Sequence, residues 1–121
     1  MVVIIIGILA AIGLPSMLNQ AAKARLSSAK NTIGAINRAQ QAYRLESTTF
    51  ASNVTQLKLG VSTPDGYSTP TITANAGNSA SASTAATDPA GTGVTGCVTV
   101  ASGITTSTVI EGNSNAAPGC S

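Results

Sequence analysis

The N-terminal end of the chain is a continuous apolar stretch. Its first fourteen residues, MVVIIIGILAAIGL, are apolar or glycine, and the first charge is at Lys23. As an α-helix rising about 1.5 Å per residue, residues 1–22 would be roughly 33 Å long, close to the thickness of a bilayer core. The pattern predicts a hydrophobic helix segment, either a plain membrane anchor or an anchor that also packs against copies of itself.

Further along, the apolar positions take up a helical spacing. Steps of three and four residues place one stripe on a single helix face, made of Leu18, Ala22, Leu26, Ala29, Ile33, Ile36, Ala39 and Tyr43. We therefore expect one helix from near Met1 to about Glu46, weakened at Gly7 and Gly13 and kinked or locally melted at Pro15. Such a helix would be about 69 Å long, too long for a domain of this size to bury. Its first half must project, and lipid or other subunits must cover it.

The second half of the chain shows weak strand patterns. A turn of helix is expected at residues 54–57, followed by strands at 67–74, 94–101 and 104–111. Pro70 demotes the first strand to a sheet edge, and Ser102-Gly103 is a hairpin turn between the other two. Residues 75–93 hold little apolar bulk and are expected to be a mobile surface loop. The predicted fold class is α+β: one long N-terminal helix packed through its C-terminal half on a small antiparallel sheet.

The amino-acid composition limits the classes of function that the chain can have. Charged residues make up 8% of the chain, aromatics 2%, and histidine is absent. Because histidine is the commonest general base and metal ligand, we expect no enzyme activity, no cofactor and no metal. Asp65 and Asp88 are interpreted as turn residues rather than calcium ligands. The basic side chains of the helix are Lys23, Arg25, Lys30, Arg38 and Arg44. Such side chains could contact DNA or lipid head groups, but more commonly they form the solvated or subunit-facing side of a helix. DNA binding is therefore possible but unsupported.

The two cysteines, Cys97 and Cys120, are interpreted as a disulfide. Two thiols without CxxC spacing or histidine do not make a zinc site. The alternative is a pair of free buried thiols. A bridge closing a loop of this length contributes on the order of 3 kcal/mol in the chain-entropy model, and it implies an oxidising compartment.

Two stretches resemble a known family. MVVIIIGILAAIGLPSMLNQAAKARLSSAKN resembles the N-terminal helix of type IV pilins, and INRAQQAYRLESTTFASNVTQLKLGV is similar to type IVa-like major pilins of cyanobacteria. The resemblance covers roughly residues 1–61. After residue 61 the chain resembles the family only in its overall arrangement, a variable sheet closed by a C-terminal cysteine pair.

The resemblance implies different roles for the two parts of the chain. Residues 1–22 would anchor the subunit in the inner membrane and then form the filament core, with Gly7 and Pro15 where pilin helices carry helix-weakening residues. Residues 23–121 would form the globular head. The implied core-packing residues are Val3, Ile4, Ile5, Ile8, Leu9, Ile12, Leu14 and Leu18. The head-facing stripe is Leu26, Ala29, Ile33, Ile36 and Tyr43.

The resemblance also implies a function and partners. The chain would be a major pilus subunit in an extracellular filament (fimbrium), serving motility, adhesion or DNA uptake, with identical subunits, the assembly machinery and prepilin peptidase as partners. Pilins begin with an N-methylated Phe followed by a Glu-containing stretch, so we expect this sequence to be N-terminally incomplete. The alternatives are a type II secretion pseudopilin, a minor pilin at the fibre tip, and a membrane-anchored sugar- or DNA-binding module. The cysteine pair and the lack of an acidic cluster favour a pilin over a pseudopilin.

Overall fold

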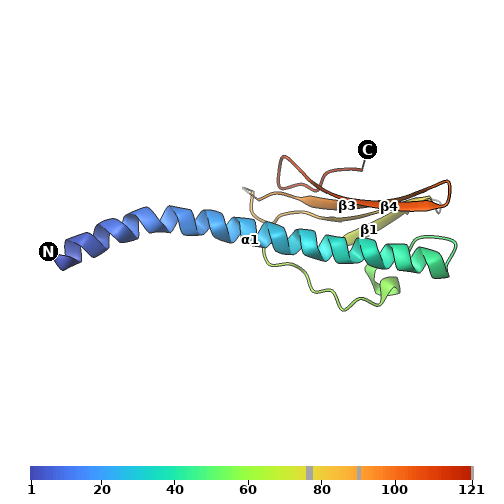
Figure 1. Cartoon of the computed structure of the whole chain (residues 1–121), viewed down its shortest axis with the longest axis horizontal. Helices are drawn as coiled ribbons and strands as arrows, with labels where there is room; N and C mark the ends of the chain where they lie inside the picture. The colour runs from blue at the N-terminus through green and yellow to red at the C-terminus, as the bar shows by residue number, and fades with distance from the viewer. Residues whose placement is uncertain (76–77, 90, 121) are drawn as a thin grey trace.

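A single long helix dominates the computed structural model, which describes residues 1–75, 78–89 and 91–120, without the side chains of residues 13–19. Helix α1 (Val2–Glu46) has 45 residues and ends where the Ser47 N–H donates to the Tyr43 carbonyl at 2.8 Å. The predicted extent of the helix is confirmed. Figure 1 shows its N-terminal half projecting away from the rest of the chain. The side chain of Pro15 lies outside the described residues, so its role as a kink stays a prediction.

The sheet has four antiparallel strands in the order β1-β2-β3-β4. Their bounds are Thr71–Asn75, Ser79–Thr84, Val94–Ala101 and Ile104–Glu111. The predicted hairpin between β3 and β4 is confirmed, and its turn residues Ser102 and Gly103 have φ of 53° and 79°. Two left-handed residues in succession match the twist of the flanking strands. The predicted helical turn is also confirmed, as the 3₁₀ helix η1 (Val54–Leu57).

The expectation of a mobile surface loop over residues 75–93 is wrong, because β2 lies within this stretch and pairs with both β1 and β3. Its burial alternates, with Ala80, Ala82 and Thr84 buried at 3%, 2% and 1% exposure. Small side chains suffice here because this face of the strand packs close to α1. Residues 76, 77 and 90 of the predicted loop lie outside the described residues.

The first strand is shorter than the sequence predicts. It begins at Thr71 instead of residue 67, and Tyr67 forms only an isolated bridge with Ala86. The Tyr67 side chain is buried and packs in the core instead. Pro70, directly before β1, interrupts pairing because it has no N–H to donate. The predicted edge position of this strand is confirmed by the strand order.

The core lies between one face of the sheet and the C-terminal half of α1. Ala29, Ile33 and Ile36 of the helix are fully buried against Ala82 and Val94 of the sheet. Leu26 is partly buried at the margin of this cluster, and Tyr43 is half-buried. A long N-terminal helix packed on a four-stranded antiparallel sheet confirms the predicted α+β class.

Two buried polar side chains of α1 attach the helix to its surroundings. Asn37 Nδ2 donates to the Thr108 carbonyl at 3.1 Å. Gln40 bonds both backbone groups of Ala51, its Nε2 donating to the carbonyl and its Oε1 accepting from the N–H, each at 2.9 Å. The second arrangement holds the chain leaving α1 alongside the helix, in the way a neighbouring strand would.

Replacing Gln40 with Ala is expected to destabilise the head by about 2–4 kcal/mol, because two buried backbone groups of Ala51 lose their partners. Urea unfolding of the whole chain in mild detergent measures the change. Gln41→Ala is the matched control, since Gln41 is only half-buried; it should change stability by about 0.5 kcal/mol or less. Equal midpoints for the two variants would show that the Gln40 bonds contribute nothing.

Candidate assembly surface

The projecting end of α1 carries a dense set of exposed apolar side chains. Each of its large apolar side chains up to Ile12 is more than half exposed, with Met1 at 99% and Ile5 at 58%. The set is Met1, Val2, Val3, Ile4, Ile5, Ile6, Ile8, Leu9 and Ile12. We call these side chains the apolar segment.

The apolar segment surrounds the helix on all sides. Eight of its nine members lie within the first nine residues, which is two and a half turns. A helix that is apolar all round is a helix that something buries. Figure 1 shows no part of the head reaching this end of α1, so whatever covers it comes from outside the chain. Among the described residues, no helix combines the length and the apolarity needed to cross a membrane.

The sequence-predicted core-packing residues fall into two groups. Val3, Ile4, Ile5, Ile8, Leu9 and Ile12 are all exposed members of the apolar segment. Leu14 and Leu18 lie among the residues whose side chains are not described, as do Gly13 and Pro15. Gly7 has open space around it, since a Cβ built there would have no neighbour within 4 Å.

Three of the five basic side chains of α1 contact other parts of the chain. Lys30 forms an ion pair with Glu111 at the end of β4, and the Arg25 guanidinium lies 3.5 Å from the Asp65 carboxylate. Arg44 donates to the Ser47 carbonyl at 3.4 Å, and its guanidinium lies 5.9 Å from the centre of the Phe50 ring. Exposed pairs of this kind contribute little stability, but they hold three basic side chains near the surface of their own head.

A shallow hollow beside Tyr67 lies near these charges. Arg25, Gly66, Asp88 and Thr92 line it together with the ring. The Tyr67 hydroxyl donates to the Thr92 carbonyl at 2.7 Å, and burial raises the pKa of this phenol. Within the part of the chain that the structure describes, no three metal-ligating side chains come together.

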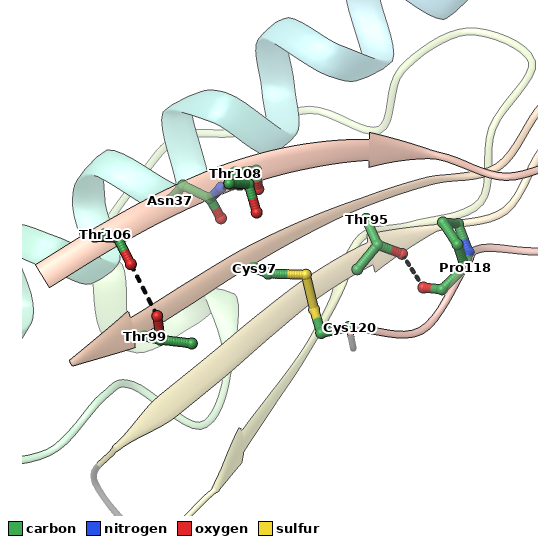
Figure 2. The surroundings of a disulfide bond; sticks show 8 residues. All are labelled: Asn37, Thr95, Cys97, Thr99, Thr106, Thr108, Pro118 and Cys120. Atoms are coloured by element: carbon green, nitrogen blue, oxygen red, sulfur yellow. Dashed lines mark hydrogen bonds between the residues drawn. A yellow bond between two sulfur atoms is a disulfide. The ribbon is translucent and has the colours of Figure 1, made fainter. Parts of the chain in front are cut away.

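The C-terminal tail is fastened to the sheet face opposite α1. Cys97 on β3 is bonded to Cys120, with the two Cα atoms 6.0 Å apart. The Thr95 hydroxyl donates to the Pro118 carbonyl at 2.5 Å, as Figure 2 shows. The Ala86 N–H also donates to the Asn115 carbonyl at 2.8 Å. Sequence reasoning expected the cysteine pair but missed Thr95, because its hydroxyl has no distinguishing pattern in a chain rich in Thr.

Removing the disulfide by Cys120→Ser is expected to lower stability by about 3 kcal/mol, because the unfolded chain regains the entropy of an open loop. Thermal unfolding of the whole chain in detergent, with and without dithiothreitol, measures the loss. The reductant should lower the midpoint of the parent and leave that of Cys120→Ser unchanged. A parent protein insensitive to complete reduction would show that the tail is held by its other contacts alone.

The sequence is similar to a known protein family. The sequence model of the family described as type IV pilin-like G and H matches residues 27–116. These residues span the head-facing part of α1, all four strands and the first five residues after β4. No curated protein and no solved structure matches the chain significantly.

Proposed function

Because the chain belongs to the type IV pilin-like family, we propose that it is the major structural subunit of a type IV pilus. The family is structural rather than enzymatic, and membership indicates a pilin or pseudopilin that is part of an extracellular filament or associated with a membrane. The observation that carries the finer proposal is the apolar segment, an apolar helix surface that the head leaves uncovered.

The size of the apolar segment supports self-assembly. Covering a large aliphatic side chain contributes about 1.5–3 kcal/mol, so nine exposed members offer well over 10 kcal/mol when buried. Association costs an estimated 4–15 kcal/mol in lost freedom and side-chain ordering. Relative to subunits exposed to water, burial of the apolar segment is therefore large enough to favour polymerisation into a helical filament with the apolar ends of α1 inside and the heads outside.

The apolar segment also needs cover before assembly. We expect lipid of the inner membrane to contact it in the unassembled subunit. Assembly then exchanges lipid contacts for helix contacts, a step with little change in hydrophobic energy, in which packing decides the geometry. The assembly machinery and prepilin peptidase are the expected partners, and motility, adhesion and DNA uptake are the expected uses of the fibre.

Mass spectrometry of filaments sheared from cells tests this proposal. A major pilin is expected to be the dominant polypeptide of the sheared fraction, with a mass two hydrogens below that of its reduced form. A chain found only in the membrane fraction would instead identify a pseudopilin. A chain present in the sheared fraction at a few copies per fibre would identify a minor pilin at the tip.

A further inference from the structure

Strand β4 forms a sheet edge without the usual protection. It has eight residues, Ile104–Glu111, and its register with β3 runs unbroken from the Val94–Glu111 pair to the Ala101–Ile104 pair. The strand therefore contains no bulge, and its sequence contains no Pro and no Lys. Natural sheets commonly use these devices to stop an edge strand from pairing with another chain.

The other edge of the sheet is different. Strand β1 has five residues and follows Pro70 directly, so it is short and begins next to a residue that cannot donate to a ladder. The one charged side chain of β4, Glu111, is already paired with Lys30. The edge of β4 therefore presents a long, straight and effectively neutral strand.

The backbone groups that face the open edge follow from the hairpin. Ladder bonds alternate along antiparallel strands, and a two-residue turn places a bonded pair at Ala101 and Ile104. The Gly112 N–H donates to the Gly93 carbonyl at 2.9 Å, which fits the same alternation at the other end. Thr105, Ser107 and Val109 thus direct their N–H and C=O groups away from β3. Among the described residues, no strand pairs with this side of β4.

The sequence of β4 is nearly palindromic about Ser107. Residues 104–110 read ITTSTVI. An antiparallel copy centred on Ser107 would place Ile104 opposite Ile110, Thr105 opposite Val109 and Thr106 opposite Thr108. Every one of these residues is β-branched, and cross-strand pairs of β-branched side chains stabilise a sheet. The same register covers Ile104 and Val109, which are 67% and 39% exposed, and keeps the two Glu111 side chains at opposite ends.

We propose that β4 pairs with β4 of a second copy of the chain, antiparallel and about a two-fold axis at Ser107. The contact is isologous, with the same surface on both partners. Subunits within one filament all point the same way, so the two copies belong to different filaments running in opposite directions. The inference rests on the proposed function, because it requires that the chain forms filaments. It deepens that function, because such a contact joins fibres that meet from opposing cells.

One such contact is weak, but many copies of it along two filaments bind strongly. Seven paired residues make a ribbon about 24 Å long, which buries less than the roughly 1,200 Å² of a stable interface. Two filaments side by side repeat the contact along their length, and linked weak contacts multiply into a tight one. Isolated subunits therefore stay unpaired at low concentration, whereas filaments form bundles.

Cross-linking through Ser107→Cys tests the register. Directly opposed residues in a bonded antiparallel pair have Cα atoms about 5.5 Å apart, within the span of a disulfide. Under mild oxidation of concentrated whole-chain protein, non-reducing gels should show covalent dimer about tenfold above the level from Thr73→Cys, the matched exposed position on β1. Equal dimer from both variants would overturn the strand pairing. The gel can be read on detergent extracts, so it decides the pairing whether or not filaments form.

Val109→Lys tests the role in bundling. A cation on the edge of β4 repels its own copy and protects the edge. Bundles collected by low-speed centrifugation should fall about tenfold or more while single filaments remain abundant, and Thr73→Lys on β1 should bundle like the parent. Unchanged bundling in Val109→Lys, or a parent whose filaments never bundle, would overturn this inference. A parent that makes no filaments would count against the proposed function alone, and the Ser107→Cys gel would still decide the pairing.

Discussion

Cells producing the Ile5→Asp variant are expected to assemble no filaments, although the head of the protein remains folded. Ile5 lies in the middle of the apolar segment and is 58% exposed, so nothing in the head depends on it. In a filament core, however, a carboxylate would lose its water without gaining a partner, which costs several kcal/mol per subunit. Because the penalty recurs at every subunit, we expect sheared filament to fall at least a hundredfold, measured by immunoblot and electron microscopy. Ile8→Asp should behave in the same way.

A volume-conserving change at the same position separates charge from shape. Ile5→Leu keeps the apolar surface and should cost under about 1.5 kcal/mol, so its filaments should be abundant. The Cys97–Cys120 bond and resistance to proteolysis report whether the head of Ile5→Asp is intact. Abundant, normal filaments from Ile5→Asp cells would reject the proposal that the apolar segment forms a filament core.

The parts of the fold that could be predicted are those with a strong periodic signal. The stripe containing Ala29, Ile33 and Ile36 predicted both the helix and the face it buries, because helix packing depends on apolar side chains three and four residues apart. The β3–β4 hairpin was predictable because Ser102-Gly103 is a turn between two runs rich in β-branched residues. The projecting half of α1 followed from length alone, since no domain of this size buries so long a helix.

The parts that were missed depend on close packing between small or polar side chains. In β2, Ala80 and Ala82 are buried at 3% and 2% exposure but carry too little apolar bulk to predict a strand. Gln40 and Asn37 are polar, yet they are buried because α1 lies against backbone groups of Ala51 and Thr108. Their bonding partners lie 11 and 71 residues away in the sequence, so no local pattern in the sequence indicates them.

The candidate site divides in the same way. The apolar segment could be predicted from the sequence, because a run of apolar residues on every side of a helix is visible without knowledge of what the helix packs against. The near-palindromic sequence of β4 indicates pairing with a second copy only once the strand is known to lie at a sheet edge. The edge position of β4 depends on β2 and β1 lying on the other side of β3. The sequence predicted β1 as an edge strand but did not indicate β2, which joins β1 to β3. A strand covered on both sides could carry the same residues without any consequence for assembly.

Gly96→Ala is expected to destabilise the head severely, because the sheet lies close against α1 at this glycine. A Cβ at Gly96 would lie 2.5 Å from both Asn37 Oδ1 and Ile33 Cγ2. Neither atom can move aside easily, since Ile33 is fully buried and Asn37 is held by its bond to Thr108. Separating the helix from the sheet opens the core, so we expect a loss of about 3 kcal/mol and a fall of roughly 10–20 °C in the thermal midpoint.

A second glycine provides a matched control with the opposite sign. Gly34 lies in α1, and a Cβ there would have no neighbour within 4 Å. Gly34→Ala should therefore stabilise the helix by up to about 1 kcal/mol, the difference in helix propensity between the two residues. Both variants add one methyl group to the same protein, so unfolding of the whole chain in detergent isolates the effect of position. If both changes proved neutral, the close approach of α1 to β3 at Gly96 would not be what fixes the helix on the sheet.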